Sequence, residues 1–373
     1  MMLQQSARPA AAARQRHGHG AAAVNAAPWR GRRSPAPSCA AALTTVAPPA
    51  HSDGDAAAPA AVGLPVPALT SPALAPAAAA PPPPPPPALL PPPAAYAAAV
   101  DAGAAKAALA AHAPRLLLLS AMAGAYIGAG ALLSLTVGGG CGGLAAAGAP
   151  GLQKLVAGVV GLPTGLILVL ACGGELVTGN LALCTAAALE GRARWAQVAK
   201  AWAIAYAGNV LGALAVVAVA AGAGLLDPGA AAAAPAAAAA SAKCSLPAAH
   251  AFFRGVLANW LVCLAVWMAA AVRDLPGKCL AALLPVSAFV AMGAEHSVAN
   301  VFIVPAGMAA SSLAAAATGG GGGGGSAVGV ADFLLGNLIP VTLGNAVGGA
   351  VCVALAYSAA FGAVGGAPLA RAG

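Results

Sequence analysis

The sequence predicts an all-helical membrane protein, and three observations lead to that fold class. Of the 373 residues, 60% are hydrophobic and only 7% are charged, so a soluble domain could not cover its surface. Long apolar runs follow one another in the last two thirds of the chain. Two of these runs are interrupted at their midpoint by glycine and polar residues. Together these features predict six transmembrane helices, two of which are broken.

Each of the six apolar runs is long enough to cross a bilayer, which takes roughly 20 residues. The second and fifth runs are too long for one simple span, so we expect each to contain a break. The predicted spans cover residues 115 to 137, 151 to 189, 197 to 223, 250 to 272, 278 to 314 and 329 to 361.

The two interruptions repeat one pattern. "GGELVTGN" (173 to 180) and "GAEHSVAN" (293 to 300) share G-x-E-x-x-x-x-N, and "GNVLGAL" from Gly208 is echoed by "GNAVGGA" from Gly344. Three spans are therefore repeated once, and because three is odd the second copy enters from the opposite face. This predicts a 3+3 inverted repeat. Irregular chain at membrane depth must line a cavity or be covered by protein, so the breaks indicate a translocation site.

The placement of positive charges supports an even number of spans. Six spans put eight Lys and Arg residues on one face and three on the other, which is the asymmetry of the positive-inside rule. The first group is Lys106, Arg115, Arg192, Arg194, Lys200, Arg273, Lys278 and Arg371, and the second is Lys154, Lys243 and Arg254.

The chain before the first span has the composition of a targeting segment. Residues 1 to 50 contain six Arg and no acidic residue, as in an organellar transit peptide, although composition does not separate plastid from mitochondrion. Residues 51 to 100 are an Ala/Pro-rich linker with a run of seven prolines. We assign residues 101 to 365 to the membrane domain and 366 to 373 to a short tail.

The titratable residues of the two breaks fall into different classes. Glu175 and Glu295 occupy equivalent places, as do Asn180 and Asn300, which favours a structural role at the helix breaks over a direct role in transport. His296 has no counterpart, because Leu176 stands at the matching place. From the residues alone, His296 is either a functional group or a satisfied core histidine. A histidine suits anion handling because it can donate a hydrogen bond or carry a charge.

Other classes of function have less support. The net charge of +8 lacks the clustered basic and aromatic face of a nucleic-acid surface, and the eight Cys include no C-x-x-C and suggest no metal site. No cofactor site is expected. An intramembrane enzyme using Glu295, His296 and Ser297 is disfavoured because consecutive side chains point in different directions. A membrane scaffold or assembly protein without transport stays open.

Four ordered blocks carry a resemblance to a known family. "GLILVLACGGELVTGN", "RGVLANWLVCLAVWM", "GAEHSVANVFIVPAGM" and "GNLIPVTLGNAVGGA" together resemble the formate/nitrite transporter family over about residues 100 to 362. The resemblance implies an aquaporin-like fold, a homopentamer and a pore in each protomer for nitrite, bicarbonate or formate. With the Arg-rich leader, it is most similar to the green-algal members of the chloroplast envelope inner membrane, with the mitochondrial inner membrane as the weaker alternative.

The resemblance also implies roles for particular residues. His296 matches the central pore histidine, Thr178 the residue that faces it, Asn337 another of its polar neighbours, and Asn259 a pore asparagine. Lys243 falls where the family has an anion-attracting lysine, although spacing alone makes it a solvated loop lysine. Two departures from the bacterial pattern remove aromatic bulk, at Leu162 and Ala294. The apolar constrictions that the resemblance implies involve Leu162, Leu166, Leu176, Val262 and Phe289.

Overall fold

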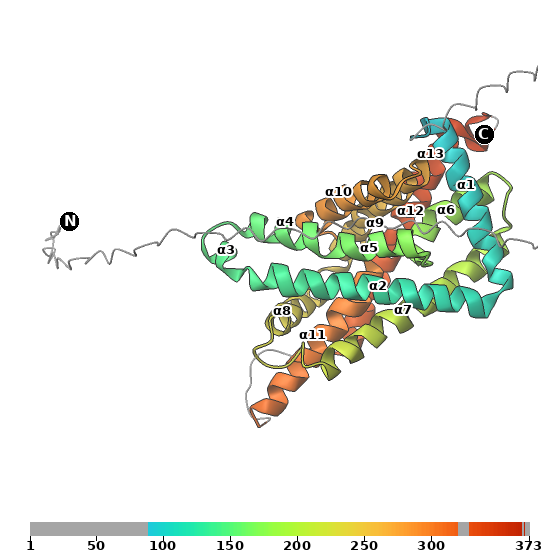
Figure 1. Cartoon of the computed structure of the whole chain (residues 1–373). Coiled ribbons are helices and arrows are strands. Elements are labelled where there is room, and N and C mark those ends of the chain that lie inside the picture. Colours follow the sequence, from blue (N-terminus) through green and yellow to red (C-terminus); the bar gives the residue numbers. More distant parts are fainter. Residues whose placement is uncertain (1–88, 320–327, 368, 370–373) are drawn as a thin grey trace, which may run out of the picture. The chain divides into compact units, whose positions relative to one another are not determined.

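The computed structural model describes residues 89 to 319, 328 to 367 and 369 (Figure 1). The predicted transit peptide and the linker up to residue 88 lie outside the described residues. So do most of the glycine run from 319 to 325 and five residues of the predicted tail. All the regular elements of the described part are helices. In addition, Leu89 and Val272 form one isolated antiparallel β-bridge.

The first helix begins inside the range assigned to the linker. α1 covers Pro92–Ala108, so the last residues of the range assigned to the linker are helical. The prolines of the Ala/Pro tract do not exclude a helix here, because Pro92 and Pro93 occupy its first turn, where a missing N–H costs nothing. The alanines that follow have the highest intrinsic helix propensity.

Seven helices of the described residues are long and apolar enough to cross a membrane. Their length and composition are those of a multi-pass membrane protein. Seven rather than six meet the criterion because both halves of the fifth predicted run qualify by themselves. These helices are α2 (Ala113–Gly140), α4 with α5 (Pro150–Val160 and Leu162–Cys172), α7 (Trp195–Gly222), α9 (Ala248–Ala271), α10 (Leu275–Met292), α11 (Ser297–Ala317) and the continuous helix Asp332–Phe361.

The second and fifth predicted runs are both broken where the sequence indicated. α5 ends at Gly173, which has φ +81°, and the chain re-enters a helix as α6 (Val177–Leu189). α10 ends in the same way at Gly293, with φ +72°, before α11 begins. Glycine is favoured at both helix ends because this left-handed conformation is costly for residues with a Cβ.

Small residues let the long helices approach closely in two equivalent places. α2 packs against α7, and α9 packs against α12 (Ile339–Gly349). A Cβ at Gly212 would collide with the carbonyl oxygen of Ala121, and one at Gly348 with that of Val256. These glycines belong to the echoed GN segments, which therefore form helix contacts of the small-residue type found in membranes.

The remaining elements are short. α8 (Ala233–Cys244) packs against α11, and two π-helical segments interrupt the last long helix. The segments are η2 (Asp332–Leu338) and η3 (Ala350–Leu355), followed by α13 (Ala356–Phe361) and the 3₁₀ turn η4 (Ala363–Gly365); α3 (Gly142–Ala146) and the 3₁₀ turn η1 (Leu109–Ala111) complete the set.

Candidate functional site

The break between α10 and α11 is built around Glu295. Lys243 Nζ lies 3.0 Å from both of its carboxylate oxygens, and the side chains of Asn300 and Asn337 donate to Oε2 at 2.7 and 3.3 Å. Glu295 is only 3% exposed, so these partners supply the hydrogen bonds that a buried charge requires. Lys243 lies in the last turn of α8, so the interpretation as a solvated loop lysine was wrong.

The break between α5 and α6 repeats this arrangement. Glu175 accepts from Lys106 Nζ at 2.8 Å and from Asn180 Nδ2 at 3.0 Å. The lysine comes from α1 here and from α8 in the other half, and both lysines are partly buried. Each break therefore contains one lysine–glutamate pair supported by the asparagine five residues after the glutamate.

Two buried asparagines fix the backbone of the breaks. Asn209 Oδ1 accepts from the N–H of Val177 at 2.9 Å, and its Nδ2 donates to the carbonyls of Ser120 and Glu175 at 2.8 and 2.9 Å. Each asparagine thus satisfies groups that a broken helix leaves without partners. Asn345 makes the corresponding bonds with the N–H of Ser297 at 2.9 Å and the carbonyls of Gly255 and Glu295 at 2.8 and 3.0 Å.

His296 caps α11 and reaches across to the other break. Its Nδ1 accepts from the N–H of Ala299 at 3.2 Å, and its Nε2 lies 3.0 Å from Thr178 Oγ1. A backbone N–H can only donate, so Nδ1 is unprotonated and the neutral ring carries its proton on Nε2. The ring is 4% exposed. The geometry therefore brings His296 and Thr178 together, with the imidazole N–H available as a donor.

The two halves differ at the positions that surround this contact. Leu176 caps α6 where His296 caps α11, and Val298 takes the place of Thr178. Gly124 occupies the α2 position that corresponds to Asn259 on α9, since Ser120 and Gly255 are equivalent partners of the two asparagines. The polar groups are thus added to a repeated scaffold in an unsymmetrical way.

The histidine forms part of the wall of a small apolar cavity. Its volume is about 10 Å³, which is about the space that one water molecule needs. Phe289 stacks on the imidazole with ring centroids 6.0 Å apart. All five residues of the predicted constriction lie in this wall, which comprises Ile127, Leu162, Leu166, Leu176, Val262, Val286, Phe289 and His296.

The two predicted pore asparagines occupy different places. Asn259 lies beside Thr178, donating to its carbonyl at 3.1 Å and to that of Asn345 at 2.7 Å. Asn337 does not hydrogen-bond to His296. It accepts from Asn300 at 2.7 Å and donates to Glu295 and to the carbonyl of Lys243, so it belongs to the carboxylate cluster.

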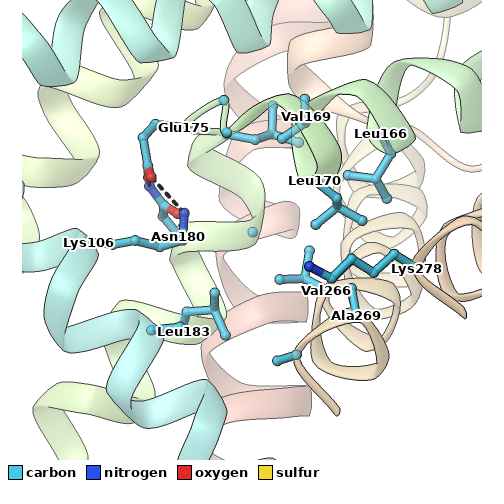
Figure 2. A pocket seen from close by; sticks show the side chains of 16 residues that line it. Lys106, Leu166, Val169, Leu170, Glu175, Asn180, Leu183, Val266, Ala269 and Lys278 are labelled. Carbon is cyan, nitrogen blue, oxygen red and sulfur yellow. Dashed lines mark hydrogen bonds and ion pairs between the residues drawn. The ribbon is translucent and has the colours of Figure 1, made fainter. Parts of the chain in front are cut away.

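A larger cavity of about 220 Å³ adjoins the histidine cavity and contains residues that sequence reasoning missed (Figure 2). The two cavities share Leu166 and Leu176, which separate them as a common wall. Lys106, Glu175 and Lys278 also line the larger one, which we call the α1-side vestibule. Lys106 had been noted only for its charge, and the signal that could have found it was the need of Glu175 for a partner equivalent to Lys243.

Comparison with known proteins identifies the family. The model of the formate/nitrite transporter family matches residues 93 to 359. The chain belongs to the formate/nitrite transporter family. It is 42% identical over 258 residues to a probable formate transporter of Methanothermobacter thermautotrophicus, covering 65% of this chain and 87% of that one. It is 34% identical over 243 residues to the nitrite transporter NirC of Escherichia coli K12, covering 64% and 80%.

The fold of this transporter-family chain is also that of a solved channel. A pentameric formate channel with formate bound matches with a TM-score of 0.58 and 32% identity, covering 67% of this chain and 98% of that one. Its relatives are transporters and channels, in line with the expectation that the chain is not an enzyme. Glu295 and His296 bond to different partners, and Ser297 Oγ has none among the described residues.

Proposed function

We propose that this member of the formate/nitrite transporter family is a channel for small monovalent anions, with one pore in each protomer. His296 Nε2 is the group that carries the proposal. It is the donor in the wall of a cavity otherwise lined by aliphatic and aromatic side chains, at the contact between the two broken helices. A dry constriction opposes ions strongly, and one directed hydrogen bond there lowers the barrier for an anion.

The path that we propose runs from the α1-side vestibule past Leu166 and Leu176 to the imidazole. When the cavity is empty, Thr178 Oγ1 accepts a hydrogen bond from the imidazole N–H. An arriving anion then replaces the threonine hydroxyl as the acceptor. Asn259 Nδ2 positions the Thr178 backbone by donating a hydrogen bond to its carbonyl oxygen. In this proposal the Glu175 and Glu295 clusters, with Asn180 and Asn300, hold the breaks in place and do not touch the anion.

The substrates that fit are small planar oxyanions, with nitrite and bicarbonate preferred. Formate has a similar size and the same charge. Relatives described as formate and nitrite transporters support this class. The absence of aromatic bulk at Leu162, which lines the cavity, argues against copying the bacterial preference directly. The Arg-rich residues 1 to 50 support uptake into the chloroplast stroma across the inner envelope membrane.

We further propose a homopentamer of six-span protomers, each an aquaporin-like 3+3 inverted repeat in which each broken run counts as one span. The equivalent bonding of Asn209 and Asn345, and of Glu175 and Glu295, supports the repeat. The pentameric formate channel that the chain resembles supports the assembly.

Anion flux into liposomes containing the purified full chain tests this function. Nitrite, formate and isotopically labelled bicarbonate are supplied separately, with protein-free liposomes as the control. We expect at least one anion to enter faster than in the control. If none does, with the protein correctly inserted and oligomeric, the channel proposal is wrong and a scaffold without transport becomes the better explanation.

A further inference from the structure

The α1-side vestibule contains an unbalanced positive charge. Lys106 from α1, Glu175 from the first break and Lys278 from α10 line the same cavity (Figure 2). Lys106 and Glu175 neutralise each other at 2.8 Å, and the second oxygen of Glu175 is taken by Asn180. Two lysines and one glutamate leave a formal charge of +1, which is the complement of one monovalent anion.

Lys278 is the residue that carries this charge. Figure 2 shows its ammonium group extended over the cavity beside Val266 and Ala269. Among the described residues, no carboxylate lies within ion-pair distance of its Nζ. The side chain is partly buried, so its charge is only partly screened by solvent.

The surroundings of the ammonium suit a small anion more than a large or polyvalent one. The cavity of about 220 Å³ is closed on its inner side by Leu166 and Leu176, which also line the histidine cavity. The first turn of α6 contributes Gly179 to the wall, and the N–H groups of a first helical turn have no partner within their own helix. Lys278 and the first turn of α6 therefore border the same space, directly before the apolar barrier.

We propose that the α1-side vestibule is a binding site for one small monovalent anion, with Lys278 as its counter-ion, where the anion waits before it crosses the Leu166–Leu176 barrier. This inference rests on the proposed channel function and assigns Lys278 a role that the lysine–glutamate pairs cannot fill. The lysine sets the concentration at which the pore saturates and makes uptake dependent on ionic strength.

The test is flux in proteoliposomes of the full chain, with formate and nitrite as probes over a range of concentrations and salt. We expect Lys278→Gln to raise the half-saturating anion concentration about tenfold and to flatten the salt dependence. Lys278→Arg should retain both properties. The matched control is Arg273→Gln, which removes an exposed positive charge five positions earlier without touching the cavity wall and should leave both properties at the wild-type value.

Each outcome separates this inference from the channel proposal. If wild-type protein carries neither formate nor nitrite, the channel proposal fails for these anions before any variant is compared. If wild type carries them and Lys278→Gln saturates at the same concentration with the same salt dependence, the vestibule site is wrong while the channel stands. Equal shifts in Lys278→Gln and Arg273→Gln would also overturn the site, because a general surface potential would then explain both. Size-exclusion elution identical to wild type shows that each variant is assembled.

Discussion

The two helix breaks of this chain have the same construction and different chemistry at their centres. Each has a glycine with positive φ, a lysine–glutamate pair, an asparagine five residues after the glutamate, and a second asparagine from a later helix. Only the break at residues 293 to 296 places a histidine at the helix cap, and only the other places a threonine two residues after the cap. The features that both breaks share fix the backbone of each break. The histidine and the threonine, which are not shared, contact each other.

This contrast separates structural from functional polar groups inside the membrane. A buried ionisable residue in a membrane protein is by default a functional candidate. Glu175 and Glu295 meet that description, yet each is paired with one lysine, hydrogen-bonded by at least one asparagine, and matched by an equivalent in the other half. His296 and Thr178 lack such equivalents, and they bond to each other across the halves.

The largest effect should come from removing the charge of one carboxylate. Glu175→Gln and Glu295→Gln each leave a partly buried lysine unpaired, and breaking a buried pair in this way costs about 3 kcal/mol or more. We expect similar, large losses of thermal stability for the two variants, measured on the detergent-solubilised oligomer. Combining Glu295→Gln with Lys243→Met should recover part of the loss. A Glu295→Gln protein with unchanged stability and no flux would show that this carboxylate is functional, contrary to our interpretation.

A smaller and again matched effect is expected for the asparagines that fix the breaks. Asn209→Ala and Asn345→Ala each leave a buried N–H and two carbonyls without their side-chain partner, a loss of about 2 kcal/mol. Thermal unfolding of both variants, with the exposed Lys200→Ala as control, measures it. Destabilisation of only one variant would break the equivalence of the two halves.

The smallest effect should appear where the halves differ in one hydroxyl group. Thr178→Val copies Val298 and conserves shape, but it leaves the buried imidazole N–H of His296 without its acceptor, so we expect a stability loss of about 1 kcal/mol. We also expect roughly fivefold slower anion flux, because the imidazole is no longer held in place between anions. The reciprocal Val298→Thr should leave flux at the wild-type rate. Equal flux in wild type and Thr178→Val would remove the threonine from the pathway.

The sequence predicted the breaks well because they depend on local chemistry. The recurring glycine and glutamate positions marked both interruptions, and the structure has a left-handed glycine at each. The coarse fold class followed from apolar run lengths. The number of helices could not be predicted from run lengths. The fifth run divides into α10 and α11, and each of these is long enough to be a span by itself.

Contacts between distant elements could not be predicted in the same way. Lys243 follows an alanine and proline tract that is typical of a loop, yet that tract forms α8 and delivers the lysine to Glu295, 52 residues later. Lys106 reaches Glu175 over 69 residues. Asn337 was expected beside His296, and its actual partners became visible only from the packing of η2 against α8 and α11.

The central claim is that anion passage depends on the residue that breaks the symmetry of the two halves. His296→Leu tests it most directly, because it places a leucine at the cap of α11, as Leu176 already does at the cap of α6. Nitrite and formate flux in proteoliposomes should fall roughly tenfold or more, while the oligomer elutes unchanged. An unchanged rate in His296→Leu would contradict this claim and assign the histidine to the packed core.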